Sequence, residues 1–330
     1  MTLKQLRYFI QTVDCGLNIT AASELLFTSQ PGISKQLKLL ESELGIKLFL
    51  KKGKSLTSLT DAGQEVYERA KRVLNDIDEI ENFAIESKGE QRGVLSIGTT
   101  HTQARYVLPD IIRQFADKFP LIDLELHQGT SEQIDELVRE KRVNCVIASG
   151  LNTFNNELLQ IPIYRWSRVA IVPKSHPLAK DKRKINLEIL SKHSLVTYIF
   201  SVQGQSSFLQ AFENQGLTPR IAFTARDADI IKTYVRKGMG VGVVASMAIE
   251  LNDLNDLYVL DIRKLFPELT TWIGIPQSMI TRTYLIDFIS LLSSHLKKDD
   301  IAKIFDLDYR DEYLNKIKDI PVPEKYLFNE

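Results

Sequence analysis

The segment TAASELLFTSQPGISKQLKLLESELG, residues 20–45, decides the fold of the N-terminal region. It predicts two helices joined by a tight turn, with Asn18 or Thr20 capping the first and Thr28–Pro31 leading into the second. The second helix repeats apolar residues on one face and ends at Gly45. Two helices joined in this way can place the second one in the major groove of DNA.

The neighbouring sequence extends this motif over residues 1–60. Residues 3–13 repeat apolar side chains at the three-and-four spacing of an amphipathic helix. Residues 48–50 and 55–59 are typical of two short strands, with the turn Lys52-Gly53-Lys54 between them. The region therefore predicts three helices followed by a basic hairpin.

Positive charge is concentrated in this region. The chain of 330 residues has 42 Lys and Arg against 42 Asp and Glu, a formal net charge of zero. Residues 1–60 contain eight of the basic residues and four of the acidic ones, so this part carries +4 and the remainder −4. A neutral chain does not coat nucleic acid, but a basic module within it fits a docking surface for DNA.

Polar and basic side chains occupy the outward face of the second helix and the hairpin. Gln, Ser and Lys can contact base edges, and free N–H groups at a helix start favour a phosphate. Hairpin lysines would contact the DNA backbone and fix register. The alternative is a solvated basic face on an ordinary helical subdomain. The candidate DNA-binding residues are Thr28, Ser29, Gln30, Ser34, Lys35, Lys38, Lys51, Lys52 and Lys54.

The overall composition is that of a globular protein. Hydrophobic residues make up 44% of the chain, and 330 residues suggest two or three domains. No apolar run approaches the ~18 residues that cross a bilayer, and the N-terminus lacks the apolar stretch of a secretion signal. Cys15 and Cys145 cannot build a disulfide framework. We therefore expect a cytoplasmic protein with no membrane partner.

Residues 61–88 change to a heptad pattern within a charged stretch. Apolar residues recur at alternating spacings of four and three, which defines one narrow stripe along a helix. Such a stripe predicts pairing with the same helix of a second copy, and packing onto the helix's own chain is the alternative. The candidate dimerisation residues are Val66, Ala70, Val73, Ile77, Ile80 and Ala84.

A polar stretch at residues 87–93 marks a domain boundary, and beyond it strand-like and helix-like runs alternate. Strand-like residues 94–98, for example, precede a helix expected near 103–119. This alternation predicts an α/β fold with parallel strands, arranged as one sheet or as two lobes. Residues 297–330 are rich in charge and receive no assignment.

Several motifs in the first 63 residues resemble those of one known family. They are Leu6-Arg7-Tyr8-Phe9, Ala21-Ala22, Thr28 to Gln36, Leu40-Glu41, Leu44-Gly45, Leu48-Phe49 and Leu59 to Gly63. They resemble the N-terminal domain of LysR-type transcriptional regulators. The resemblance implies a winged helix-turn-helix at 1–60, a dimerising linker helix at 61–88 and an effector-binding domain at 93–296.

The same resemblance implies the fold and the partners of the later region. The effector domain would have the two lobes of periplasmic binding proteins, lobe I at about 93–163 and 268–296 and lobe II at about 164–267. The implied assembly is a pair of dimers on an interrupted inverted repeat of double-stranded DNA, with RNA polymerase as a further partner. Residues 297–330 would form a C-terminal extension of uncertain role.

Motifs of the effector domain resemble one branch of this family, the CysB-like regulators of sulfur assimilation and cysteine biosynthesis. They are Thr99 to Tyr106, Leu195 to Tyr198, Gly216 to Ile221 and Ile230 to Arg236. A LysR-type regulator of another pathway, for example nitrogen or aromatic metabolism, is the alternative.

The segment Thr99–Gln103 offers hydroxyl and amide groups at a predicted helix start, where free N–H groups attract anions. A capping box of Thr100 and Gln103 would explain the same residues without a ligand. The CysB-like resemblance implies instead that a small anion or acetylated serine binds here, in a cleft. The candidate effector-binding residues are Thr100, Thr102, Gln103, Ser149, Ser201 and Gln203.

Two of these residues depart from the CysB-like pattern. Ser149 and Gln203 stand where such proteins tend to have threonine. Serine keeps the hydroxyl, whereas glutamine changes the size of the side chain and adds donors, which leaves the effector open. Neutral hydroxyl and amide donors suit sulfate, thiosulfate or O- or N-acetylserine better than a cation or an apolar molecule.

Other motifs point to no catalytic or metal centre. Gly53-Lys54-Ser55 lacks the earlier glycine of a phosphate-binding loop, and Gly238–Gly242 lacks dinucleotide-binding spacing. The five histidines and two cysteines show no ligand spacing. We expect no enzyme, no metal and no cofactor besides the small-molecule effector. A sulfate-type solute-binding protein would share the two lobes, but it would need an export signal and no basic N-terminal domain.

Overall fold

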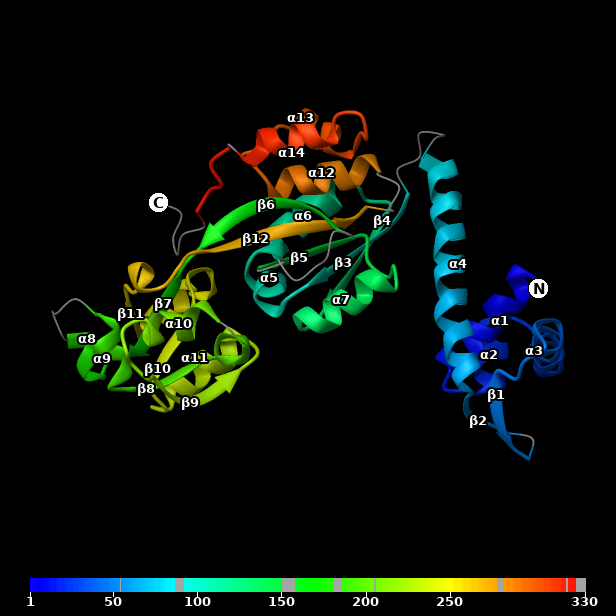
Figure 1. The fold of residues 1–330 in the computed structure, drawn as a ribbon, viewed down its shortest axis with the longest axis horizontal. Coiled ribbons are helices and arrows are strands. Elements are labelled where there is room, and N and C mark those ends of the chain that lie inside the picture. The colour runs from blue at the N-terminus through cyan, green and yellow to red at the C-terminus, as the bar shows by residue number, and fades with distance from the viewer. Residues whose placement is uncertain are drawn as a thin grey trace. The chain divides into compact units, whose positions relative to one another are not determined.

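A computed structural model describes residues 1–53, 55–86, 92–149, 158–180, 185–204, 206–277, 282–318 and 320–324. The chain divides into two compact units. The first comprises Met1–Arg92 with Arg139–Arg142, and the second comprises Gly93–Val138 with Val143–Glu330. Figure 1 shows the helices and strands of both.

The first unit begins with the three expected helices, α1 (Leu3–Asp14), α2 (Ile19–Leu25) and α3 (Gln30–Leu44). The Asn18 side chain caps α2 by accepting hydrogen bonds from two backbone N–H groups. The Ser29 side chain caps α3 by accepting one hydrogen bond, from the Gly32 N–H, and Gly45 ends the helix in the left-handed conformation at φ 69°. Buried side chains of all three helices, together with those of the hairpin, form one core.

The hairpin follows as β1 (Phe49–Lys52) and β2 (Ser55–Leu59), which pair antiparallel. A buried carboxylate ties it to α3. Glu41 is 4% exposed and accepts hydrogen bonds from the backbone N–H groups of Leu48, at 2.9 Å, and Phe49, at 3.4 Å. The start of this hairpin, which is the wing of the winged helix-turn-helix, is therefore hydrogen-bonded directly to a side chain of α3.

Helix α4 (Asp61–Glu86) divides the expected heptad stripe into two parts. Ala70 is 3% exposed and Val66 is partly buried, and both pack into the core of the first unit. Val73 and Ile80 are 42% and 62% exposed. The sequence assigned Ala70 to a partner helix, and the structure corrects this because its methyl group is already buried against its own domain.

The first lobe of the second unit contains a five-stranded sheet in the order β4-β3-β5-β12-β6. β3 pairs parallel with β4 and β5, whereas β12 runs antiparallel to both of its neighbours, so the sheet is mixed. The strands are β3 (Gly93–Thr99), β4 (Ile122–Gln128), β5 (Cys145–Ser149), β6 (Leu158–Trp166) and β12 (Leu269–Pro276).

Helices cover both faces of this sheet. Ile134 on α7 packs with one group of strand residues, and Phe115 on α6 packs with another group that also includes α12. The helix expected near 103–119 is two helices, because the chain breaks at Val107 and Pro109 starts a new turn. The helices are α5 (His101–Tyr106), α6 (Leu108–Lys118), α7 (Ser131–Arg139) and α12 (Thr283–Leu292).

The second lobe is built in the same way around the strand order β11-β7-β10-β8-β9. Phe208 and Phe212 of α10 pack on one face with residues of α8 and α9, and Ile231 of α11 belongs to the large core cluster. The elements are β7 (Arg168–Pro173), α8 (Pro177–Lys180), α9 (Leu187–Ser191), β8 (Ser194–Tyr198), α10 (Ser207–Glu213), β9 (Arg220–Ala225), α11 (Ala228–Arg236), β10 (Val241–Ala245) and β11 (Leu257–Leu260).

The chain passes between the lobes twice. β6 stays in the first sheet to Trp166 and β7 of the second sheet starts at Arg168, so Ser167 alone separates them. The return runs from Phe266 to Leu269, where β12 begins. Pairing of β6 with β12 thus places the first crossing about three residues later than the expected end of lobe I near residue 163.

The C-terminal extension, which had no predicted structure, forms α13 (Lys298–Phe305) and α14 (Arg310–Lys318). Ile301, Ile304 and Ile317 are buried in the core of the first lobe. Beyond these helices, the N–H of Arg165 donates a 2.8 Å hydrogen bond to the carbonyl of Pro323. The extension is therefore an integral part of the first lobe. Across all the residues described, no helix is long and apolar enough to span a bilayer.

Candidate DNA-binding and effector-binding sites

The start of α3 presents polar groups to solvent. The Ser29 hydroxyl accepts a hydrogen bond from the N–H of Gly32, and Pro31, in the first turn, has no N–H that would need a partner. Ser29, Gln30, Lys35 and Lys38 are exposed, and Thr28 and Ser34 are partly exposed. A shallow hollow runs along this face, lined by Pro31, Ser34, Lys35, Lys38 and Leu39.

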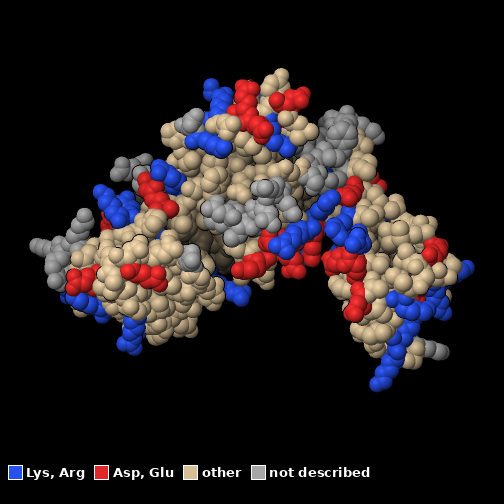
Figure 2. Space-filling model, viewed as in Figure 1, with Lys and Arg blue, Asp and Glu red and all other residues tan. Residues whose placement is uncertain are grey.

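The hairpin adds further basic groups. Lys51 and Lys52 are exposed on β1, and the Lys51 ammonium lies 3.9 Å from the Glu41 carboxylate. Lys54, at the turn, lies outside the described residues. Figure 2 shows basic side chains on the end of the first unit that carries the hairpin. A basic helix face next to a basic hairpin is suited to bases and phosphates of a duplex.

The candidate effector residues of the first lobe lie on α5 and β5. Thr100 precedes α5, but its side chain makes no capping hydrogen bond, so the capping box considered from sequence is absent. The Gln103 side chain turns inward, is 2% exposed, accepts a hydrogen bond from the Tyr164 hydroxyl and donates to Thr271 at 3.4 Å. The position of Gln103 therefore needs an explanation other than helix capping.

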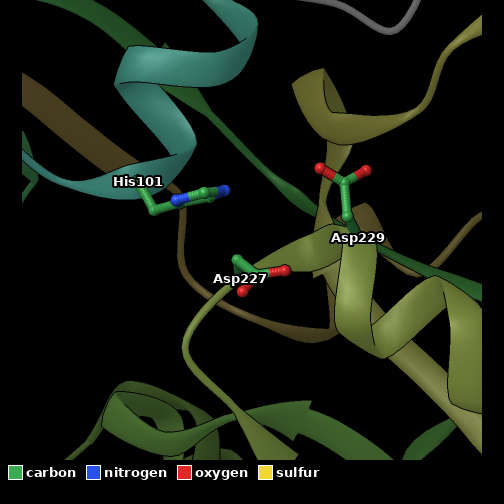
Figure 3. A group of neighbouring side chains, drawn as sticks. All are labelled: His101, Asp227 and Asp229. Carbon is green, nitrogen blue, oxygen red and sulfur yellow. The ribbon is translucent and has the colours of Figure 1, made fainter. Parts of the chain in front are cut away.

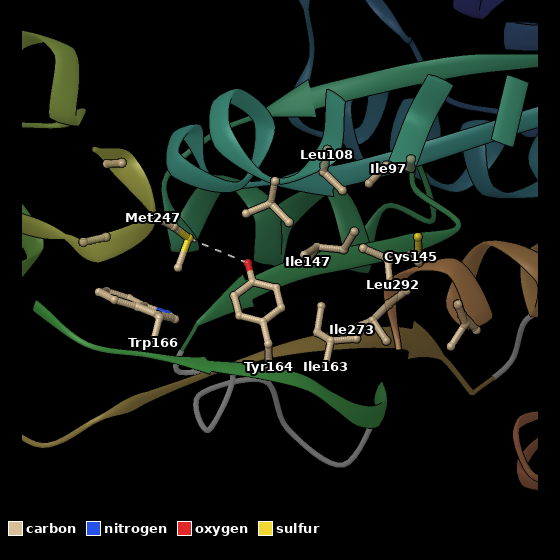
Figure 4. Packing of buried hydrophobic residues seen from close by; sticks show 14 of the residues in the cluster. Ile97, Leu108, Cys145, Ile147, Ile163, Tyr164, Trp166, Met247, Ile273 and Leu292 are labelled. Carbon is tan, nitrogen blue, oxygen red and sulfur yellow. Dashed lines mark hydrogen bonds between the residues drawn. The ribbon is translucent and has the colours of Figure 1, made fainter. Parts of the chain in front are cut away.

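Ser149 joins the same polar network. Its hydroxyl lies 2.9 Å from the Thr271 hydroxyl and accepts a 2.9 Å hydrogen bond from the Trp166 indole N–H. Gln103 and Ser149, far apart in sequence, thus share Thr271 as a partner. Figure 4 shows Tyr164 and Trp166 among apolar residues near Met247, and burial raises the pKa of the Tyr164 hydroxyl, which keeps it a donor.

In the second lobe, Tyr198 connects α5 with the end of β8. Its hydroxyl accepts a 3.1 Å hydrogen bond from the Ala245 N–H, and the Thr102 side chain on α5 acts to lower its pKa. Burial raises the pKa of Tyr198 to about 12, so the hydroxyl stays protonated. Ser201, in the turn after β8, is 1% exposed and its hydroxyl has no partner among the described residues. Gln203 is exposed.

Charged side chains of the two lobes meet beside α5. Tyr106 donates a 2.7 Å hydrogen bond to Asp229, and Arg105 lies 3.1 Å from Glu250. Burial acts to raise the pKa of Asp229, but Tyr106, Lys232 and Arg105 outweigh it and hold the pKa below its ordinary value. The site of the candidate effector residues on α5 is therefore adjacent to an ionic contact between the lobes.

One group in this contact, among the residues described, has the spacing of metal ligands. His101, Asp227 and Asp229 have ligand atoms within 4.8 Å of one another, with the imidazole facing the two carboxylates (Figure 3). Asp229 already interacts with Lys232 at 3.2 Å and Arg105 at 3.6 Å. These two cations oppose the binding of a third, so the group is better described as part of the ionic contact.

Comparison with known proteins gives the family. Residues 3–64 match the family described as "Bacterial regulatory helix-turn-helix protein, lysR family", and residues 88–297 match the "LysR substrate binding domain". The chain belongs to the LysR family. It is a DNA-binding transcriptional regulator, as the motifs of the LysR helix-turn-helix predicted.

Individual LysR relatives place the chain in the predicted branch. The transcriptional regulator CysB of Haemophilus influenzae is 43% identical over 303 residues, which cover 92% of this chain and 93% of that protein. The regulator SsuR of Burkholderia cenocepacia is 38% identical and covers 92% of this chain and 98% of its own. The CysB-like resemblance is thereby confirmed.

A solved structure agrees with these LysR relatives. The crystal structure of the cofactor-binding domain of the Cbl transcriptional regulator is 38% identical, with a TM-score of 0.60. It covers 64% of this chain and 92% of the Cbl domain. The α/β fold expected for the LysR effector domain is therefore shown.

Three residues of the LysR effector domain were missed by sequence reasoning as members of the site. Thr271 was not singled out because only the antiparallel pairing of β12 with β5 places it opposite Ser149. Tyr164 is 5% exposed, as a core aromatic is, but its hydroxyl also donates a hydrogen bond to the Gln103 side chain. Tyr198 stood within a family motif, yet nothing in its neighbourhood in the sequence signals the hydrogen bond that its hydroxyl accepts from the Ala245 N–H.

Proposed function

We propose that this protein regulates genes of sulfur assimilation and cysteine biosynthesis in response to a small anion or acetylserine bound to its effector domain. The single observation that carries the proposal is the 43% identity to CysB over nearly the full length of both chains. The polar network of Gln103, Thr271 and Ser149 supports it, because buried hydroxyl and amide groups of this kind recognise small polar ligands.

The DNA-binding role belongs to α3 and the hairpin. Exposed Gln30 and Lys35 and partly exposed Ser34 contact base edges, whereas exposed Lys51 and Lys52 contact phosphates. Thr28, Ser29 and Lys38 supply further contacts on either side. Lys54 belongs to the same proposal from its sequence position alone.

The assembly is a pair of dimers that binds an interrupted inverted repeat and acts on RNA polymerase. This assembly is supported by the half of α4 that the core of the first unit does not cover. Val73, Ile80 and Ala84 are exposed and Ile77 is partly exposed, so this stripe can pack against the same helix of a second copy.

The effector contacts Thr100, Thr102, Gln103 and Ser149 in the first lobe and Ser201 and Gln203 in the second. The buried Ser201 hydroxyl supports this assignment, since a buried donor without a protein partner is costly unless a ligand satisfies it. Binding changes transcription only if the effector has different affinities for two arrangements of the protein on DNA.

Replacing Ser34 or Lys35 by Ala is expected to weaken operator binding by about 1–3 kcal/mol and to relax base preference. Replacing Lys52 by Ala should instead weaken all sequences alike and flatten the dependence of affinity on salt, because a phosphate contact releases counterions. Gel shifts at matched ionic strength measure both effects. Lys174→Ala, which removes an exposed lysine of the effector domain, is the control. Unchanged affinity and base preference in the α3 variants would refute their assignment to base contacts.

Titration of sulfate, thiosulfate and O-acetylserine is expected to give heat with the wild-type protein. Thr102→Ala should bind the responding ligand at least tenfold more weakly, since a hydrogen bond to a charged group contributes about 1.5–3 kcal/mol. Thr218→Ala removes an exposed hydroxyl of the second lobe and should bind normally. If none of these compounds binds, the sulfur assignment fails and a LysR-type regulator of another pathway, such as nitrogen or aromatic metabolism, takes its place.

A further inference from the structure

The second lobe contains a buried arginine next to the candidate effector residues. Arg168, the first residue of β7, is 5% exposed. One terminal guanidinium nitrogen lies 3.5 Å from the Pro267 carbonyl and the other terminal nitrogen lies 3.3 Å from the Ser207 hydroxyl. Both acceptors are neutral, and both distances exceed the usual 2.9–3.0 Å of an N–H···O bond.

Arg168 and Lys232, the other buried cation described in this lobe, differ in how many carboxylates lie near them. Lys232 is 2% exposed and has three carboxylates nearby, those of Asp253 at 2.9 Å, Asp229 at 3.2 Å and Glu250 at 3.8 Å. Within the part of the chain that the structure describes, Arg168 has no carboxylate partner. A buried charge of this kind is costly unless an opposite charge accompanies it.

The surroundings of Arg168 link it to the effector candidates. Arg168 pairs with Ala245 across strands β7 and β10, and the Ala245 N–H donates a 3.1 Å hydrogen bond to the Tyr198 hydroxyl. Ser207 follows Ser206, whose hydroxyl donates to the carbonyl of Ser201. Burial lowers the pKa of the Arg168 guanidinium to about 10, which still leaves it charged at neutral pH. The charged Arg168 side chain thus contacts Ser207, and the preceding residue, Ser206, is bonded to Ser201.

We propose that Arg168 is the charge partner of the effector, and that an anionic oxygen of the bound molecule, from a carboxylate or a sulfate-type oxyanion, neutralises its guanidinium. This inference rests on the proposed effector site and adds to it the group that selects for charge. Hydroxyl and amide donors alone bind polar molecules whether or not these are charged. A guanidinium desolvated in advance favours anions over neutral molecules of the same shape.

The test compares Arg168→Met and Arg168→Lys with wild type in the full-length protein. Thermal unfolding and calorimetry are run with sulfate, thiosulfate, phosphate and O-acetylserine at constant ionic strength. We expect Arg168→Met to lose at least tenfold in anion affinity while its melting temperature without anion stays equal to or above that of wild type. Arg168→Lys keeps the charge and should retain part of the affinity. Arg263→Met, which removes an exposed arginine of the same lobe, controls for net charge and should bind as wild type does.

Each other outcome contradicts the inference or separates it from the proposed function. Wild-type anion affinity in Arg168→Met would overturn the inference. A loss of stability in both Arg168 variants, with unchanged anion affinity in the folded fraction, would also overturn it, because a purely structural arginine gives that result. Binding of phosphate alone, lost in Arg168→Met, would support Arg168 and refute the sulfur effector. Equal binding of sulfur compounds to wild type and Arg168→Met would support the sulfur effector and refute the role of Arg168. If wild type binds no anion, both the sulfur effector and the role of Arg168 are refuted.

Discussion

Replacing Lys232 by Met is expected to lower the free energy of unfolding of the effector domain by about 3 kcal/mol or more. The Lys232 ammonium is buried between Asp253 and Asp229 and also donates a 3.0 Å hydrogen bond to the Ala248 carbonyl. Without it, the one charged partner that the described residues leave to the 5% exposed Asp253 carboxylate is Arg236, at 2.8 Å. Breaking one member of a buried network leaves the others charged and poorly solvated, which is why the loss is large.

Urea unfolding followed by circular dichroism measures this loss. Arg263→Met is the matched control, since it removes an exposed partner of Asp261 and should cost only ~0–1 kcal/mol. Equal losses in the two variants would show that burial of the Lys232 network adds nothing.

The same network makes stability depend on pH. Burial acts to raise the pKa of Asp253, but the Glu250 N–H, Lys232 and Arg236 outweigh it and hold the pKa below its ordinary value. A carboxyl with a lowered folded-state pKa stabilises the protein above its unfolded-state pKa, and this contribution disappears as the pH falls through the folded-state value. Wild type should therefore lose stability below about pH 4, and Lys232→Met should show a shallower loss over the same range.

Gly63→Ala is expected to destabilise the DNA-binding domain by ~3 kcal/mol and to abolish operator binding. A Cβ at this position would lie 2.1 Å from the Leu48 carbonyl oxygen, which is a backbone atom and cannot move aside cheaply. The Leu48 N–H also donates a hydrogen bond to the Glu41 carboxylate, and the Leu48 carbonyl accepts a 3.0 Å hydrogen bond from the Thr60 N–H. Inserting the methyl group must push the start of α4 away from the base of the wing.

Thermal unfolding and gel shift together measure this effect. Ala62→Ser changes the adjacent exposed residue of α4 and should leave both nearly unchanged. Normal operator affinity in Gly63→Ala would show that the close approach of α4 to Leu48 has no part in positioning the wing.

The helices of the DNA-binding domain could be predicted from sequence because their signals are local. Asn18, Ser29, Pro31 and Gly45 each mark a helix end by the chemistry of one side chain or one backbone angle. The heptad stripe on α4 was predicted only in part, since periodicity shows that a face is apolar but not which partner covers it. Ala70 is covered by its own domain and Ile80 is not.

The candidate effector site was harder to predict because it depends on contacts between distant segments. The spacing of Thr100 and Gln103 fitted a capping box equally well, and only the inward turn of Gln103 toward Thr271 excludes it. The burial of Arg168 and the three carboxylates around Lys232 follow from the packing of the second lobe. No local pattern in the sequence distinguishes these two cations from exposed ones.

The single residue that separates β6 from β7 has a mechanical consequence. Trp166, on one side of Ser167, holds Ser149 of the first lobe, and Arg168, on the other side, contacts Ser207 of the second. The Ser167 carbonyl is itself fixed by a 2.9 Å hydrogen bond from the Ser246 N–H. The polar contacts of Ser149 in one lobe and of Ser207 in the other are therefore joined through a single intervening residue of backbone.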